Sequence, residues 1–246
     1  EGSLWSQGIL PIDSIKLLKE SRGEDYLDMD ESSTMDWDSL REIVREQGIR
    51  NSNVMAIAPT ATIANITGVS QSIEPTYQNL YVKSNLSGEF TVTNIPMVDT
   101  LKELGIWDSV MINDLKYYDG SVNEISRIPD DVKELYATAF DIEPRWLIDA
   151  ASRRQKWIDQ SQSLNLYIDE PSGKKLDIMY RMAWLRGLKT TYYLRSRSAT
   201  TTEKSTISTG ELNAVSASAQ SEERLQPNTT APSACSVLDP DCDACQ

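Results

Sequence analysis

Two cysteines close to the end of the chain are the first residues whose type and spacing can carry chemistry. Cys242 and Cys245 are separated by only two residues, so their thiols can close a small disulfide ring and exchange two electrons as a pair. Only one further cysteine, Cys235, is present, which is too few for a four-cysteine zinc site. The pattern therefore predicts a redox-active dithiol and no metal site.

A pair of adjacent tyrosines, Tyr192 and Tyr193, is the second candidate. A phenol can lose an electron while it passes its proton to a neighbour, so two phenols in a row can relay both. Neighbouring side chains on a β-strand point to opposite faces, so the two rings are expected on opposite sides of a sheet. The alternative is that both are β-favouring aromatic residues that only pack within a strand.

The turn after residues 54–58 is the third candidate, because it can hold a phosphate group. The apolar run VMAIA at 54–58 is typical of a buried parallel strand, and residues 60–66 predict a helix that ends near Gly68. The first amides of a helix are unpaired and lie at the positive end of its dipole. The residues that would bind phosphate are Pro59, Thr60, Ala61, Thr62 and Ile63. A strand-to-helix turn without a ligand is the alternative.

The elements around these candidates alternate between helix and strand, which predicts an α/β fold. Helices are expected at residues 14–20, 36–48, 97–104, 129–140, 144–158 and 171–187. In the second of these, Asp36 is the expected N-cap and Gly48 the expected C-terminal stop. Strands are expected at residues 90–93, 163–168 and 188–194, with a turn at residues 119–120. In the helix at 171–187, one apolar stripe contains Leu176, Met179, Tyr180, Ala183 and Trp184.

The composition changes abruptly after Arg197, where Ser, Thr, Ala, Gln and Asn become dominant. Such a segment cannot bury enough apolar surface to offset the entropy lost on ordering. We therefore expect a folded part at 1–197 and a flexible tether at 198–246 that carries the dithiol at its tip. A flexible chain of this length spans about 35 Å, so the dithiol could move between a pocket and solvent.

The overall composition excludes several classes of function. The net charge of −13 argues against a nucleic-acid-binding surface, which needs a basic face. The complete lack of histidine excludes Ser-His-Asp and Cys-His catalysis and zinc sites with histidine ligands. No apolar run is long enough to span a membrane, and there is no signal-peptide pattern. Together with the cysteine usage, this predicts a cytoplasmic protein.

Four stretches and the tail, read in order, resemble the C-terminal part of the large (α) subunit of class I ribonucleotide reductase. The matching stretches are VMAIAPTATI at 54–63, SIEP at 72–75, DQSQSLN at 159–165, GLKTTYYLR at 187–195 and CDAC at 242–245. The resemblance runs from about residue 8 to residue 197 and resumes at the tail tip. It implies the C-terminal portion of a ten-stranded α/β barrel that reduces ribonucleoside diphosphates to deoxyribonucleoside diphosphates by radical chemistry.

The resemblance also implies a role for each candidate. Residues 59–63 would bind the substrate diphosphate, although many relatives have Ser or Thr where this chain has Ile63. Tyr192 and Tyr193 would relay a radical from the small (β) subunit, which would hold the metal-radical cofactor. Cys242 and Cys245 would re-reduce the active-site disulfide and be recharged by thioredoxin or glutaredoxin. The helix at 172–187 is similar to the one on which the small subunit's C-terminal peptide docks. Its apolar stripe is expected to pack in the core, with a role in the docking groove as the alternative.

The family's remaining catalytic residues have no counterpart in this sequence. Its radical-bearing cysteine, its two substrate-reducing cysteines and its catalytic Glu and Asn lie upstream of the matched segment. The chain is therefore expected to need a missing N-terminal region, either as a piece of a longer protein or as the downstream half of a split gene. A non-catalytic interaction module with an acidic tail is the alternative function.

Overall fold

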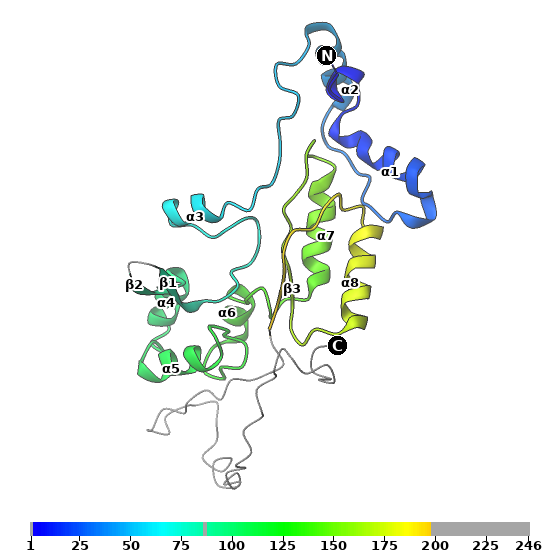
Figure 1. Cartoon of the computed structure of the whole chain (residues 1–246). Coiled ribbons are helices and arrows are strands. Elements are labelled where there is room, and N and C mark those ends of the chain that lie inside the picture. The colour runs from blue at the N-terminus through cyan, green and yellow to red at the C-terminus, as the bar shows by residue number, and fades with distance from the viewer. Residues whose placement is uncertain (1, 86–87, 198–246) are drawn as a thin grey trace, which may run out of the picture. The chain divides into compact units, whose positions relative to one another are not determined.

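The computed structural model describes residues 2–85 and 88–197 (Figure 1). The predicted tether at 198–246, with all three cysteines, lies outside these residues. The helices are α1 (Ser14–Arg22), α2 (Trp37–Gln47), α3 (Ala61–Thr67), α4 (Ile95–Glu103), α5 (Ser109–Tyr117), α6 (Asp130–Leu135), α7 (Pro144–Gln155) and α8 (Gly173–Leu185). The strands are β1 (Leu80–Asn85), β2 (Gly88–Thr93), β3 (Leu166–Ile168) and β4 (Leu194–Ser196).

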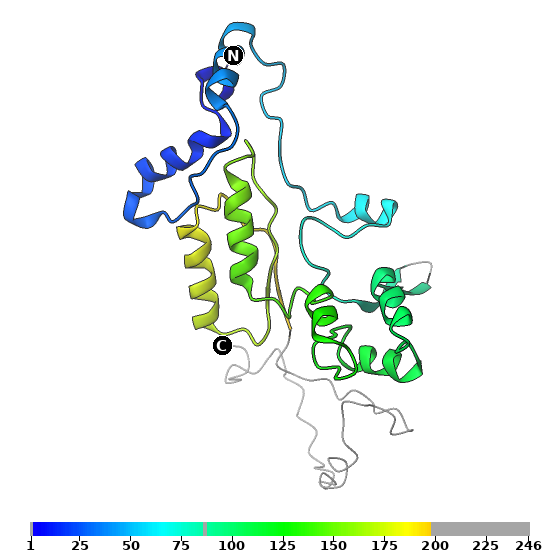
Figure 2. The ribbon, with the colours of Figure 1, turned by 180° about the vertical axis from the view of Figure 1, so that it is seen from behind.

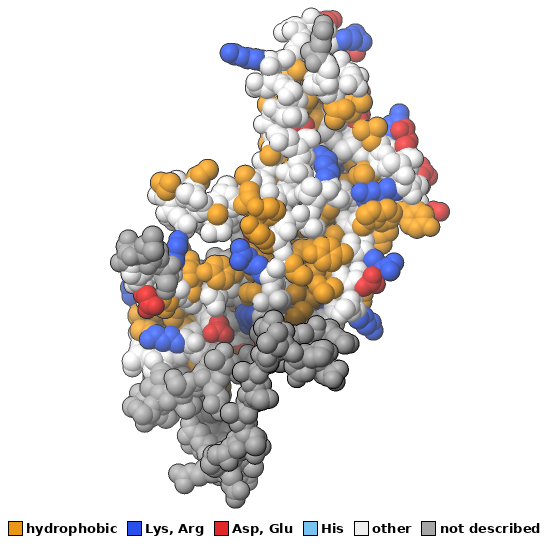
Figure 3. Space-filling view, in the orientation of Figure 1, with side chains coloured by type: hydrophobic (Ala, Val, Ile, Leu, Met, Phe, Trp, Pro, Cys, Tyr) orange, Lys and Arg blue, Asp and Glu red, His pale blue; other side chains and the backbone are white. Residues whose placement is uncertain are grey.

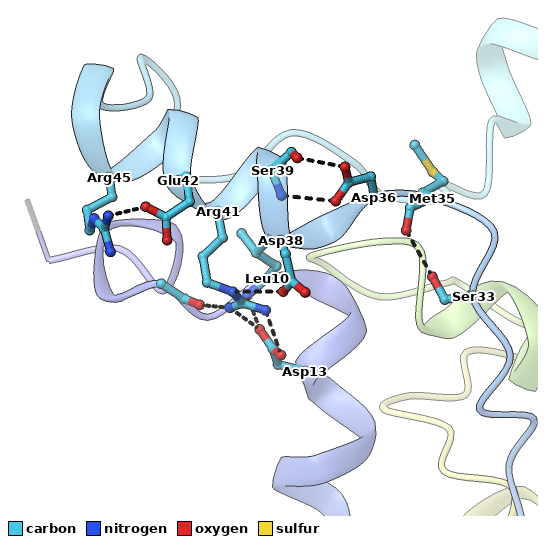
Figure 4. A network of polar contacts seen from close by, with 11 residues as sticks. Leu10, Asp13, Ser33, Met35, Asp36, Asp38, Ser39, Arg41, Glu42 and Arg45 are labelled. Carbon is cyan, nitrogen blue, oxygen red and sulfur yellow. Dashed lines mark hydrogen bonds and ion pairs between the residues drawn. The ribbon is translucent and has the colours of Figure 1, made fainter.

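A network of polar contacts joins α2 to the start of the chain (Figure 4). The predicted N-cap at Asp36 is confirmed, because its carboxylate accepts a hydrogen bond of 3.0 Å from the Ser39 amide. The Arg41 guanidinium donates to both carboxylate oxygens of Asp13, at 2.8 and 3.1 Å, and also to the Gly8 carbonyl. These bonds hold α2 against residues 8–13, over a small core of Trp5, Leu10 and Val44.

The middle of the chain forms an antiparallel hairpin packed with three helices. Strands β1 and β2 pair in register from Leu80 opposite Thr93, and buried side chains of α4, α5 and α6 share one apolar core with Leu80. The predicted turn at Asp119-Gly120 is confirmed, and both residues have positive φ. A Cβ at Gly120 would lie 2.6 Å from the Leu80 amide nitrogen, so glycine is required at this close approach.

The third part contains the parallel pair β3 and β4, with α7 and α8 packed side by side (Figures 1 and 2). Leu166 of β3 pairs with Leu194 of β4. Ile148 and Ala151 of α7 and Met179 and Ala183 of α8 are buried in one core with β3. Parallel strands covered by helices are the α/β architecture that the sequence predicts.

Several element boundaries differ from the prediction. The helix expected at 129–140 ends at Leu135, because the Asp141 carboxylate accepts bonds from the amide and hydroxyl of Thr138 and forms a turn there. The strand expected at 188–194 begins only at Leu194. On α8, Tyr180 and Trp184 belong to the predicted apolar stripe but are exposed. Only the side of the helix that contains Met179 and Ala183 is buried in the core.

The predicted strands at 54–58 and 163–168 are also altered. The first is parallel, as expected, but its only ladder partner among the described residues is Gln162, which pairs with Ile57. Val54 and Met55 are therefore more than half exposed, and the prediction of a buried strand is wrong for this chain. The second strand is shorter, at β3, and residues 164–168 are buried on both faces. Helices cover one face, and the Glu74 carboxylate contacts the other.

Candidate functional site

Residues 159–168, here called the central segment, lie between two parallel neighbours. On one side, the Ile57 amide donates to the Ser161 carbonyl and the Ser163 amide donates to the Ile57 carbonyl. On the other side, the Tyr192 amide donates to the Leu164 carbonyl at 2.7 Å, and the Leu166 amide donates to the Tyr193 carbonyl at 2.8 Å. The central segment therefore pairs on one side with the strand that leads to the turn after residue 58 and on the other side with the tyrosine pair.

The turn at 58–63 has the strand-to-helix form that the sequence predicts. Helix α3 begins at Ala61 and is followed by Gly68 as its C-cap. Thr60 has a left-handed backbone, with φ of 53°, and its carbonyl accepts from the Ala64 amide. The Thr60 hydroxyl oxygen accepts a 2.8 Å bond from the Ser72 amide, which leaves its proton available for an anion.

The predicted phosphate-binding residues differ in their exposure. Ala61, Thr62 and Ile63 are exposed, whereas Pro59 and Thr60 are half-buried. The first amides of a helix have no partner within it, so those at the start of α3 can donate to an anion from solvent. Ile63 contributes no polar side-chain atom and can act only through its amide.

The two tyrosine rings lie against each other rather than on opposite faces. Their centroids are 4.2 Å apart with the ring planes inclined by 52°, and each side chain is about half exposed, at 50% and 52%. The expectation of opposite faces is wrong because Tyr192 and Tyr193 precede β4 and do not alternate as strand residues do. The hydrogen bond to Tyr193 and the charge of that neighbouring phenol raise the pKa of Tyr192 above its usual value.

Two residues that precede the tyrosines attach this stretch to the central segment, and neither was among the predicted site residues. The Lys189 ammonium donates to the carbonyls of Ile158 at 3.0 Å and Gln160 at 2.8 Å, and burial lowers its pKa. The Thr190 hydroxyl donates to the Gln162 carbonyl at 2.9 Å. Two features of the sequence could have indicated this role. Both residues lie in the stretch 187–195 next to the tyrosines, and both have side chains that can donate to backbone carbonyls.

Glu74 was also missed as a functional candidate, although it lies in the SIEP stretch. Its carboxylate accepts from the Asn165 amide at 2.8 Å, from the Asn165 side-chain nitrogen at 3.0 Å and from the Tyr167 hydroxyl at 3.1 Å. Burial and the negative charge of Glu74 raise the pKa of Tyr167 to about 12, which keeps this phenol protonated as a donor. The loop with Ser72 and Glu74 thus contacts both the turn and the central segment.

The predicted dithiol and the question of a metal site concern different parts of the chain. Cys242 and Cys245 lie outside the described residues, so the dithiol stays a prediction. Within residues 2–85 and 88–197, no group of three or more Cys, Asp or Glu side chains is arranged to hold a metal ion. No helix in that same part of the chain is long and apolar enough to cross a membrane.

A family model described as the barrel domain of ribonucleotide reductase matches residues 1–194. The chain belongs to this family. It is 61% identical over 207 residues to the ribonucleoside-diphosphate reductase subunit alpha of Chlamydia muridarum, covering 84% of this chain and 20% of that protein. It is 36% identical over 250 residues to the large subunit of Arabidopsis thaliana, covering 99% of this chain and 29% of that protein.

The structure agrees with this membership. It resembles the class Id ribonucleotide reductase alpha subunit of Actinobacillus ureae, with a TM-score of 0.56 and 27% identity over 80% of this chain and 37% of that chain. The chain is therefore part of an α/β barrel, and it spans about a fifth to three tenths of the curated relatives cited here. A closed barrel pairs every strand on both sides. The backbone groups of Met55 and Ile57 bond to the central segment, so the opposite edge of residues 54–58 is where a further barrel strand would pair. The alternative of a non-catalytic interaction module is not favoured.

Proposed function

We propose that this chain is a working part of a ribonucleoside-diphosphate reductase large subunit and supplies three components of its reaction. One observation carries this proposal. The central segment pairs on one side with the strand that leads to the turn at 58–63 and on the other side with the tyrosine pair. A substrate site and a radical path must be adjacent in such an enzyme, and the central segment lies between the residues proposed for each. The family membership supports the same reading.

The first component is the binding of the substrate diphosphate by Pro59, Thr60, Ala61, Thr62 and Ile63. The amides at the start of α3 would donate to phosphate oxygens, where the helix dipole adds a favourable field. The bond from the Ser72 amide fixes the Thr60 side chain, so its hydroxyl proton is directed without loss of rotamer freedom on binding. Such a site recognises the diphosphate and leaves the base to be recognised by other residues.

The second component is the passage of a radical through Tyr192 and Tyr193. Each phenol is oxidised by loss of one electron and one proton. Both are returned by the next group in the path, which is the second phenol for the first tyrosine and the cysteine thiol for the second. Rings in contact at 4.2 Å between centroids are close enough for direct transfer. The radical would originate at a metal-containing cofactor in the small subunit and end on a cysteine in the part of the large subunit that this chain does not contain.

The third component is the re-reduction of the active site by Cys242 and Cys245. Reduction of one ribonucleoside diphosphate gives one deoxyribonucleoside diphosphate and one water, and it oxidises two active-site thiols to a disulfide. Thiol–disulfide exchange would pass the two electrons and two protons of the tail dithiol to that disulfide. Thioredoxin or glutaredoxin would then reduce the tail disulfide.

The small subunit would dock on α8. Apolar side chains gather over this helix in Figure 3, and Ile178, Tyr180, Trp184 and Leu185 are all more than a third exposed. Ile178 and Leu185 lie on one flank of α8 and Tyr180 and Trp184 on the other, with charged residues on the outward face between them. An exposed apolar flank of this kind suits an extended or helical peptide of a partner.

The test is Tyr193→Phe in the complete large subunit, assayed with its small subunit for reduction of a ribonucleoside diphosphate. Loss of turnover with unchanged substrate binding is expected, because phenylalanine keeps the ring but cannot form a phenoxyl radical. Tyr136→Phe is the matched control, since it also removes a phenol hydroxyl, which bonds to Thr100 in the α4–α6 core. Normal turnover by the Tyr193 variant would contradict the relay.

A further inference from the structure

Glu74 contacts the central segment on the face that the helices do not cover. Three donors converge on its carboxylate: the backbone amide of Asn165, the side-chain nitrogen of Asn165, and the hydroxyl of Tyr167. Asn165 and Tyr167 are both buried, at 7% and 6% exposed. A carboxylate with three donors, two of them from one residue, is held in a single position.

The bond from Glu74 decides which way the Asn165 amide group is turned. An asparagine side chain has an oxygen and a nitrogen at nearly equivalent positions, and only their partners distinguish the two orientations. Because Glu74 can only accept, it takes the nitrogen, so the Asn165 oxygen points toward the tyrosine pair. That oxygen accepts from the Tyr193 amide at 3.3 Å. If the amide group turned over, its NH₂ group would face the Tyr193 N–H, and two donors would oppose each other.

We propose that Glu74 is a positioning residue for the tyrosine pair, acting through the side-chain amide of Asn165 on the backbone of Tyr193. This inference rests on the proposed role of that pair in radical transfer. Glu74 touches neither phenol, so it takes no part in the redox step itself. Its effect is to hold the Tyr193 backbone, and with it the contact between the two rings.

The expected effect is on turnover rather than on substrate affinity. Misplacing a reacting group by about 1 Å can cost roughly 100-fold in rate, and the bond from Asn165 is the side-chain bond that holds the Tyr193 amide. Glu74→Gln replaces one acceptor oxygen by a donor and removes the preference for one amide orientation. In the complete enzyme with its small subunit, we expect kcat for nucleoside diphosphate reduction to fall about 10- to 100-fold, with KM within twofold of the wild type.

Tyr167→Phe is the matched control for a purely structural role of Glu74. It removes the third bond to the same carboxylate but leaves both bonds to Asn165, so kcat should stay within twofold while the melting temperature falls. A double-mutant cycle with Asn165→Ala then tests the route of the effect. If Glu74 acts through Asn165, Glu74→Gln combined with Asn165→Ala turns over no more slowly than Asn165→Ala alone.

A pH profile gives a second readout that does not depend on Glu74→Gln being folded. Asn165→Asp keeps an acceptor for the Tyr193 amide but sets two carboxyl groups against each other. One shared proton can replace the lost donor, so this variant should be active at low pH and lose activity as that proton dissociates. A profile that coincides with the wild type would overturn the proposal.

Three other results would also overturn it: unchanged kcat in Glu74→Gln, a rise in KM at constant kcat, or additive losses in the double-mutant cycle. The Tyr193→Phe variant separates this inference from the proposed function. If Tyr193→Phe turns over normally, the relay itself is wrong. If Tyr193→Phe is inactive and Glu74→Gln is normal, the relay stands and only the role of Glu74 is wrong.

Discussion

The Asp159 carboxylate attaches two distant parts of the chain to the central segment, and its removal gives a measurable local effect. It accepts from the Val54 amide at 2.7 Å, the Met55 amide at 2.9 Å and the Trp5 indole at 2.9 Å. Asp159→Asn keeps the size of the side chain but turns an NH₂ group toward at least one of these donors. A hydrogen bond to a charged group contributes about 1.5–3 kcal/mol, so the attachment of residues 54–55 should weaken by about that amount.

Hydrogen exchange at the two backbone amides measures this loss directly. A loss of about 1.5–3 kcal/mol corresponds to exchange that is about 10- to 150-fold faster at Val54 and Met55. Asp36→Asn is the matched control, because it also replaces a carboxylate that accepts from a backbone amide, yet asparagine caps a helix as well as aspartate does. Unchanged exchange at Val54 and Met55, or equal acceleration throughout the chain, would refute this reasoning.

The same carboxylate makes the attachment depend on pH. Burial opposes ionisation of Asp159, but the bonds from the Met55 amide, the Trp5 indole and the Val54 amide outweigh it and hold its pKa below the usual value. A carboxyl group whose pKa is lowered in the folded chain contributes stability that is complete above its ordinary pKa of about 3.9. This stability is lost as pH falls through the lower folded pKa. Protection of Val54 and Met55 should therefore be constant above about pH 5 and decline below pH 4.

Three further predictions concern other parts of the chain. Cys242→Ser should abolish turnover driven by thioredoxin in the complete enzyme but keep a single turnover from pre-reduced enzyme; continued cycling would exclude the shuttle role. Gly120→Ala should lower stability by more than 2 kcal/mol in thermal unfolding, since its Cβ would meet the Leu80 backbone, whereas Gly105→Ala, with positive φ but open space, should cost about 1 kcal/mol. Ile178→Glu should weaken binding of the small subunit at least tenfold in a titration, with little change in melting temperature, because this side chain is exposed.

The elements whose residues carry their own local signals could be predicted from the sequence. The Asp36 cap, the glycines that end α2 and α3, and the Asp119-Gly120 turn depend on neighbouring residues only, and the structure has them where expected. Strand limits were less predictable, because pairing depends on distant partners. Residues 188–193 have the composition of a strand, yet Lys189 and Thr190 use their side chains to bond to carbonyls of the central segment.

The candidate site was predictable in its residue types but not in its geometry. The turn and the tyrosine pair could be found from the chemistry of their residues. That both flank the central segment could not be predicted, because the central segment lies about a hundred residues from the turn along the chain. The ring contact of Tyr192 and Tyr193 was missed because alternation applies only to residues within a strand. Glu74 was missed because a single carboxylate in a loop shows no periodicity, and its three donors belong to residues 91 and 93 positions away.

Polar side chains on the central segment offer a physical reason for its exact register. Hydrogen bonds between parallel strands are evenly spaced, so backbone pairing alone does not distinguish one register from another. Side-chain hydrogen bonds do distinguish the registers. Asp159 binds the amides at 54–55 in only one alignment, and Asn165 binds the Tyr193 amide in only one alignment. A slip of one residue on either side would leave a buried or half-buried polar group without its partner, at about 1–3 kcal/mol each. The turn at 58–63 and the tyrosine pair are thus set relative to each other by two polar residues six positions apart.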